Sequence, residues 1–156
     1  MYDRNGIVPL STGESLAIVY PATRTVISRD CRTYAPDAHW VGVSDYPTGE
    51  EIGWAAGAAS QSDVVLVFTQ NADSNTAQQA LIRALPTEKT VVVALWSPFD
   101  VLALPDVAAY LATYSPLDPA VPAVCAAIFG AESPQGHLPV ALGDAFSAGT
   151  GVVDGG

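Results

Sequence analysis

Polar side chains able to hydrogen-bond a ligand gather in three short segments of the chain, residues 70–75, 97–100 and 115–118. Amide, carboxyl and hydroxyl groups of this kind can bind a sugar or a partner domain. Turns and helix caps require the same residue types, and capping is the more common role for any one of them. The candidates are Asn71, Asp73, Asn75, Ser97, Asp100 and Ser115.

No pair of carboxyl groups is well placed for glycoside hydrolysis, which requires two carboxyls about 5–9.5 Å apart across the scissile bond. Glu50 and Glu51 are adjacent in a predicted helix and point in different directions. Thr48 and Glu51 have instead the spacing of a capping box. His39 and His137 are far in sequence from any promising Ser or Cys nucleophile. The sequence therefore predicts no catalytic residue.

The overall composition excludes several classes of partner. A net charge of −10, with six Lys and Arg residues among 156, leaves no basic stripe for nucleic acid. A P-loop and a Gly-x-Gly-x-x-Gly motif after a strand are both missing, so no nucleotide cofactor is predicted. Apolar residues make up 49% of the chain, but no run approaches the about 20 residues of a membrane span. We expect a soluble, single globular domain.

Cysteine content and the first residues give two further expectations. Cys31 and Cys125 are far apart in sequence and too few for a disulfide framework or a zinc site, so we expect two free thiols and no metal. Residues 1–5 are polar, which predicts no secretory leader in this chain. The compartment is left open.

Four continuous, β-branched runs predict strands that are buried on both faces. Helical patterns lie between or after three of them, as in a doubly wound, mostly parallel α/β sheet with helices on both sides. Ligands bind such sheets outside the carboxyl ends of the strands, so the three polar segments should meet at one edge. The predicted strands are Leu16–Tyr20, Val64–Thr69, Thr90–Trp96 and Ala108–Tyr114.

Capping residues predict where two of the helices begin. The Thr48 box predicts a helix over Gly49–Ser60. Thr76 and Gln79 repeat the same device ahead of a second helix.

A third helix is predicted after Asp118, with Pro119 at its first position. It should run to Phe129 and end at Gly130 in the left-handed conformation.

Other segments carry weaker patterns. Thr25–Ile27 and Trp40–Val43 can each form a short strand. We expect one α/β domain over residues 1–144 and a flexible tail over residues 145–156, which is rich in Gly, Ser, Ala and Thr. Trp54 and Trp96 lie in a predicted helix and at the end of a predicted strand, so core or interface packing is expected for both.

Several segments, taken in order from Asn5 to Leu142, resemble the C-terminal domain of family 3 glycoside hydrolases. The resemblance covers nearly the whole chain, and its closing motif is the most specific part. The matching segments are Asn5-Gly6-Ile7-Val8-Pro9-Leu10, Gln78-Gln79-Ala80-Leu81-Ile82-Arg83-Ala84-Leu85, Ser97-Pro98-Phe99-Asp100, and Phe129-Gly130 through Pro134-x-Gly136-x-Leu138-Pro139-Val140.

The resemblance implies a three-layer, flavodoxin-like sheet packed beside a (β/α)₈ barrel that carries an aspartate nucleophile. In the β-glucosidase branch this domain also lends a glutamate as acid/base, from a loop ahead of the Gln-x-x-Leu-Ile helix. The corresponding residues 69–75 contain no glutamate. The chain is therefore more similar to the β-N-acetylhexosaminidase branch, whose acid/base lies on the barrel. His137 departs from the family's usual arginine or lysine.

These observations predict a non-catalytic domain that packs against a barrel supplied elsewhere and is inactive alone. Its implied partners are the barrel of a parent glycosidase and a β-linked saccharide containing N-acetylglucosamine. The alternative is a free-standing module that binds a carbohydrate or a protein through the same three segments.

Overall fold

The computed structural model describes residues 1–4, 6–11 and 13–154, so Asn5 of the opening motif lies outside it. Its centre is one sheet of seven strands in the order β3-β2-β4-β5-β6-β1-β7. The strands are β1 Tyr2–Asp3, β2 Leu16–Pro21, β3 His39–Val43, β4 Val64–Thr69, β5 Thr90–Ala94, β6 Ala109–Ala112 and β7 Val153–Asp154.

The four predicted buried strands are present as β2, β4, β5 and β6, and the predicted Trp40–Val43 strand is confirmed within β3. β5 ends at Ala94, before the predicted Trp96, and β6 ends at Ala112, before the predicted Tyr114. These five are parallel, with registers such as Leu66 opposite Val91. β1 adds antiparallel to β6, and β7 adds parallel to β1. The doubly wound, mostly parallel sheet expected from the sequence is thus present.

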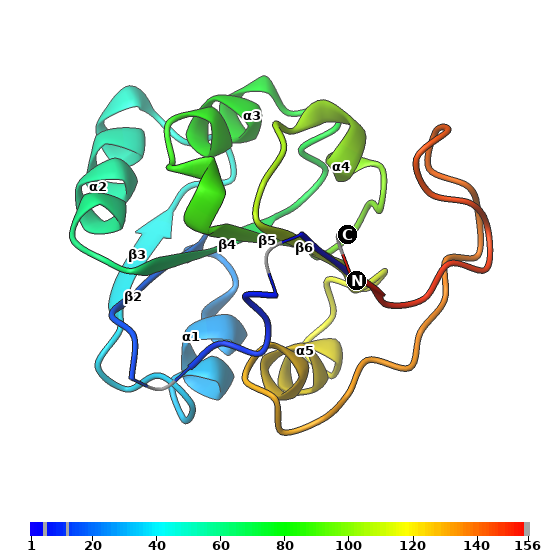
Figure 1. The fold of residues 1–156 in the computed structure, drawn as a ribbon. Coiled ribbons are helices and arrows are strands. Elements are labelled where there is room, and N and C mark those ends of the chain that lie inside the picture. The colour runs from blue at the N-terminus through cyan, green and yellow to red at the C-terminus, as the bar shows by residue number, and fades with distance from the viewer. Residues whose placement is uncertain (5, 12, 155–156) are drawn as a thin grey trace.

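Helices cover both faces of the sheet, which gives three layers (Figure 1). Alternate residues of the central strands supply two cores: Ile18 and Leu66 face α1 and α5, whereas Val19 and Val67 face α2 and α3. Burial on both faces explains why these strands are continuous apolar runs. The helices are α1 Thr25–Cys31, α2 Gly49–Ser60, α3 Thr76–Arg83, α4 Asp100–Ala103 and α5 Ala120–Ile128, with a 3₁₀ turn, η1, at Thr87–Lys89.

The start of α2 is confirmed and that of α3 is corrected. Thr48 and Glu51 form the predicted capping box, with the Thr48 N–H donating to Glu51 Oε2 at 2.7 Å. In α3 the cap is Asn75, whose Oδ1 accepts from the N–H groups of Ala77 and Gln78. Thr76 is already helical, because Asn75 supplies the same kind of cap one residue earlier.

The start of α5 is also corrected. The helix begins at Ala120, Pro119 is its N-cap, and no side chain caps it, so Asp118 does not play the predicted role. The helix ends at Ile128, one residue before the predicted end. Gly130 has the predicted left-handed conformation (φ +75°), and a Cβ there would lie 2.8 Å from Pro9 Cβ.

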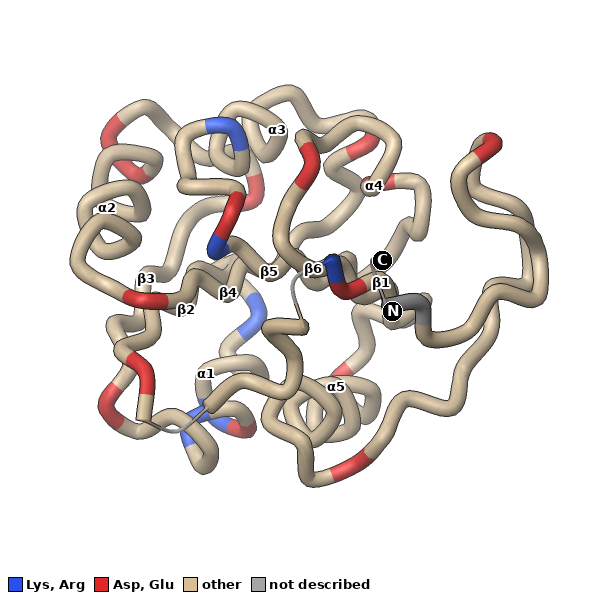
Figure 2. Tube along the Cα trace, in the orientation of Figure 1, with Lys and Arg blue, Asp and Glu red and all other residues tan. Residues whose placement is uncertain are grey.

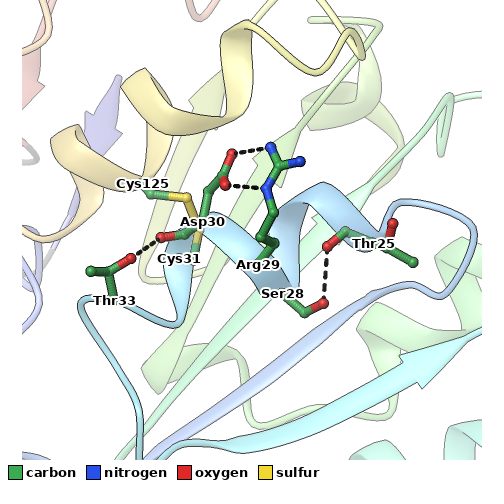
Figure 3. Close-up of a disulfide and its surroundings, with 7 residues drawn as sticks. All are labelled: Thr25, Ser28, Arg29, Asp30, Cys31, Thr33 and Cys125. Carbon is green, nitrogen blue, oxygen red and sulfur yellow. Dashed lines mark hydrogen bonds and ion pairs between the residues drawn. A yellow bond between two sulfur atoms is a disulfide. The ribbon is translucent and has the colours of Figure 1, made fainter.

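The prediction of a strand over Thr25–Ile27 is wrong, because helix α1 begins at Thr25. Its β-branched residues favour a strand locally, but Val26 and Ile27 are buried against the sheet as part of a helical face. Figure 3 shows α1 beside α5, with Cys31 at the end of one helix and Cys125 inside the other.

The prediction of two free thiols is wrong, since Cys31 and Cys125 form a disulfide with a Cα–Cα distance of 5.2 Å (Figure 3). The two residues are 94 apart in sequence, and both are fully buried. Their pairing depends on the packing of α1 against α5, which sequence spacing does not reveal.

The last residues fold back along the domain and return to the sheet. The segment extends away from α5 and turns at the isolated bridge between Leu142 and Phe146 (Figure 1). It returns to β1, where Tyr2 pairs with Val153. The Tyr2 and Phe146 rings meet edge to face, with centroids 5.5 Å apart. The flexibility expected for residues 145–156 stays a prediction.

Candidate functional site

The carboxyl ends of β4, β5 and β6 lie side by side because the three strands are parallel neighbours. The polar segments that follow them therefore emerge at one edge of the sheet, as predicted. The loop between β3 and α2, residues 44–48, emerges at the same edge. We call this set of four loops the carboxyl edge.

Three of the six predicted site residues accept hydrogen bonds from backbone N–H groups two or three residues further along the chain. Asn75 caps α3, Ser97 Oγ accepts from the Phe99 N–H at 3.2 Å, and Ser115 Oγ accepts from the Leu117 N–H at 3.3 Å. These are the capping and turn roles that compete with ligand binding for such residue types.

Asp100 is fully buried and joins two loops of the carboxyl edge. Its carboxylate accepts from Thr69 Oγ1 at 2.7 Å and from the Asp73 N–H at 3.1 Å. Burial raises the pKa of the Asp100 carboxyl, and the hydrogen bonds from Thr69 and Asp73 oppose that rise. Asp100 thus fixes the loop after β4 and has no access to a ligand.

Gln78 joins the loops after β3 and β4, a role that the sequence did not reveal. Its Nε2 donates to Asp45 O at 3.0 Å, and its Oε1 accepts from the Gln70 N–H at 2.8 Å. Asn75 Nδ2 donates to the same Asp45 carbonyl at 2.8 Å. The signal available in the sequence was the position of Gln78, a polar residue three positions before Leu81 and therefore on the buried face of α3.

The loop after β6 is tied to the loop after β5. Tyr110, which is buried in β6, donates its hydroxyl to Pro98 O at 3.1 Å. Thr113 Oγ1 donates to Leu95 O at 2.9 Å. All four loops are therefore connected by side-chain hydrogen bonds, which fix them relative to one another.

A polar pocket of about 270 Å³ opens between the loops after β3, β4 and β5. Asn71 and Asn75 line it, whereas the other four predicted residues lie outside it. Tyr46 and Trp96 stand at the pocket and are 74% and 54% exposed. The remaining lining residues are Asp45, Gln70, Ser74 and Gln78.

Large apolar side chains continue along the edge beyond the pocket. Phe99, Tyr114 and Leu117 are 42%, 42% and 64% exposed. Of the two alternatives predicted for Trp96 and Trp54, core packing is wrong, because both residues are 54% exposed. Interface packing stays a prediction. Clustered exposed aromatics are typical of surfaces that contact another protein or a ligand.

Two acidic side chains at this side of the domain, Glu51 and Asp100, are engaged in hydrogen bonds that hold the loops. Hydrogen bonds from Thr48 and Ser44 hold the pKa of Glu51 at about 2, so this carboxyl is ionised at neutral pH. Asp100 is buried. Among the described residues, no group of three His, Cys, Asp or Glu side chains is arranged to hold a metal ion. Acidic residues are spread along the chain over the whole domain rather than gathered at one point (Figure 2).

Comparison with known proteins identifies the family. The profile of the glycosyl hydrolase family 3 C-terminal domain matches residues 3–149, and the chain belongs to this family. No curated protein sequence matches it.

Two solved structures share the fold. One is a glycoside hydrolase family 3 β-N-acetylglucosaminidase from a Paenibacillus species, with a TM-score of 0.73 and 24% identity over 82% of this chain. The other is a fungal multi-domain family 3 β-N-acetylglucosaminidase that has a GCN5-related glucosamine N-acetyltransferase region. Its TM-score is 0.69, with 18% identity over 83% of this chain. The match spans 27% and 16% of those two chains.

The resemblance to the family 3 C-terminal domain is thereby confirmed, as is the three-layer α/β fold that it implied. Among the described residues, no helix has the length and apolar character needed to cross a membrane.

Proposed function

We propose that this domain packs through its carboxyl edge against the (β/α)₈ catalytic barrel of a family 3 glycoside hydrolase and supplies no catalytic residue. The observation that carries this proposal is the set of exposed apolar side chains, which we call the row, on loops that buried and part-buried hydrogen bonds hold in place. Trp96, Phe99 and Tyr114 belong to this row. Exposed aromatic groups on a fixed backbone lose little conformational entropy when a partner covers them.

The non-catalytic role is supported by the chemistry of the edge. Residues 70–75 contain no glutamate, Glu51 is held ionised in the α2 cap, and Asp100 is buried. A retaining glycosidase needs a carboxylic acid with a raised pKa in contact with the leaving group. The barrel would then supply both the nucleophile and the acid.

The glutamate-free loop also favours an N-acetylhexosaminidase as the parent enzyme. The two solved relatives are named as β-N-acetylglucosaminidases. The proposed substrate is accordingly a β-linked saccharide containing N-acetylglucosamine, bound mainly by the barrel.

Docking can be tested with the Paenibacillus enzyme from which the matching domain has been deleted. Titration of this chain into that protein should give a complex that Trp96→Ala weakens by about tenfold or more. Trp54→Ala is the matched control, since both indoles are 54% exposed but Trp54 lies on α2. An equal loss in the two variants, or no complex with the unmodified chain, would contradict the proposal.

The pocket between Tyr46 and Trp96 supports a second candidate, a free-standing carbohydrate-binding module. Two exposed aromatic rings beside amide side chains are suited to the apolar face and the hydroxyl groups of a sugar. Calorimetric titration with N-acetylglucosamine and with cell-wall fragments separates the two candidates. Micromolar binding without a barrel would favour the module, and Trp96→Ala should then abolish it.

A further inference from the structure

An apolar groove of about 350 Å³ lies beside β6, at the other end of the carboxyl edge from the polar pocket. One wall is the small-residue face of α5, which includes Ala123 and Ala127. The opposite wall is the returning C-terminal segment, which includes Leu138 and Phe146. In Figure 1 this segment leaves α5, loops outward and comes back beside the N-terminus.

The groove continues the line of β1 within the sheet. β1 lies between β6 and β7 for only two residues, with Tyr2 opposite both Tyr110 and Val153. If both registers are extended, a residue placed directly before Met1 falls opposite Ala112 on one side and Gly151 on the other. Ala112 and Gly151 both line the groove.

The backbone of β6 presents hydrogen-bonding groups to the groove. The Thr113 N–H donates to Ala94 O at 3.0 Å, toward β5. The Arg4 N–H donates to Ala108 O at 2.9 Å, on the opposite side. Carbonyl groups alternate in direction along a strand, so the Ala112 carbonyl points to the same side as the Ala108 carbonyl, away from β5. Within a regular strand the Ala112 N–H points the same way as its carbonyl. The ladder to β1 stops at Tyr110, before Ala112 is reached.

The opposite wall, formed by the returning C-terminal segment, also presents a backbone hydrogen-bonding group beside the groove. The Met1 N-terminal amine donates to Gly151 O at 3.3 Å, next to the last pair between β1 and β7. A residue before Met1 would thus have strand backbone on both sides. β1 fills the space between β6 and β7 next to the groove, with the usual spacing of about 4.8 Å to each neighbour. We therefore infer that the groove is a slot for one strand.

We propose that this groove binds an extended polypeptide segment as a strand antiparallel to β6. Unpaired strand edges are templates for such addition, in which main-chain hydrogen bonds give affinity and side-chain pockets give specificity. Small α5 residues such as Ala123 leave room for β-branched side chains on one face of the added strand. The slot admits a free strand but not a second copy's β6, which is embedded in its own sheet.

The source of the strand is the polypeptide that carries the barrel, and only this point rests on the proposed function. Thr113 and Tyr114 line the groove and also belong to the carboxyl edge. A segment that lies in the groove therefore runs directly into the surface proposed to contact the barrel.

The test adds residues before Met1 and measures amide hydrogen exchange at Ala112. An extension of alternating Val and Thr, five residues long, should slow exchange at Ala112 by about tenfold or more relative to a Gly-Ser extension of equal length. It should also raise the unfolding midpoint by about 3 °C or more. Ala123→Phe, which narrows the groove, should remove both gains. Ala80→Phe, at an exposed position of α3, should leave them.

Equal exchange at Ala112 with the two extensions would overturn the proposal. Protection that grows with protein concentration would overturn it as well, because the occupant would then be a second molecule. Neither result requires a barrel, so failure here is distinguishable from failure of the docking proposal.

Discussion

Two regions of this domain are held together by different means. A disulfide between Cys31 and Cys125, both fully buried, joins α1 to α5 covalently. The carboxyl edge is joined by hydrogen bonds from buried or half-buried side chains, and its outer surface exposes Trp96 and Tyr46. The difference separates the residues that hold the domain folded from those that shape the surface proposed to contact the barrel. Changes in the first region should alter stability alone, and changes in the second should alter the loops.

Loss of the disulfide should have the largest effect on stability. The two cysteines are 94 residues apart in sequence. Closing a loop of that length raises the free energy of unfolding by about 4–5 kcal/mol in the chain-entropy description. The Cys31→Ser, Cys125→Ser double variant should lose that amount of unfolding free energy in denaturant titrations. Acrylamide quenching of Trp96 in the folded state should not change, as measured in a variant with Trp40 and Trp54 replaced by Phe. Increased quenching would show that the two regions are coupled.

Asp100→Ala should have the second largest effect, a loss of about 2–3 kcal/mol of unfolding free energy. The variant leaves the Thr69 hydroxyl and the Asp73 N–H without their buried acceptor. Amide exchange at Asp73 should rise, whereas exchange in α5 should not. Asp100→Asn is the matched control, because it keeps the shape and one acceptor oxygen.

Comparison of the wild-type chain with Asp100→Asn gives a pH dependence. Burial raises the folded-state pKa of Asp100 above its usual 3.8, so ionisation opposes folding. The wild-type chain should therefore lose stability relative to Asp100→Asn as the pH rises through and above 3.8. A wild-type advantage that grows with pH would contradict the burial of this carboxyl.

Gln78→Leu should lower the free energy of unfolding by about 1–3 kcal/mol, because the Gln70 N–H and the Asp45 carbonyl each lose a hydrogen-bond partner. Amide exchange at Gln70 should rise. Ala80→Leu on the exposed face of the same helix should leave both quantities unchanged. Equal effects in the two variants would show that the loops do not depend on Gln78.

Glu51→Gln should have the smallest effect, confined to the start of α2. Hydrogen bonds from Thr48 and Ser44 lower the pKa of Glu51 from 4.5 to about 2. The wild-type advantage should be complete above pH 4.5 and should disappear as the pH falls toward 2. A pH-independent difference between the two proteins would exclude the carboxylate as its source.

The sheet was predictable because its central strands are buried on both faces and so consist of continuous apolar, β-branched runs such as Val64–Thr69. The common edge of the loops followed from parallel pairing. Helix α1 was not predictable by the same rule, because Thr25–Ile27 is β-branched and only its packing on the sheet makes it helical. That error also concealed the disulfide, since Cys31 had no helix to bring it to Cys125.

The site was predicted less completely than the fold. Asn71 and Asn75 do line a pocket, but Ser97 and Ser115 bind their own loops and Asp100 is buried. Local sequence does not distinguish a cap from a ligand contact, because the same side-chain atoms serve both. Trp96 shows a further limit: it follows a buried strand, yet it points to solvent because the strand has ended at Ala94.

The central claim is that this edge is a contact surface and not a catalytic centre. Its most direct test is the release of p-nitrophenol from p-nitrophenyl N-acetyl-β-D-glucosaminide by the purified chain, with Asp73→Asn and Asp100→Asn assayed beside it. We predict no release above background for all three proteins. Turnover by the unmodified chain that survives removal of host enzymes and is lost in either variant would contradict the account.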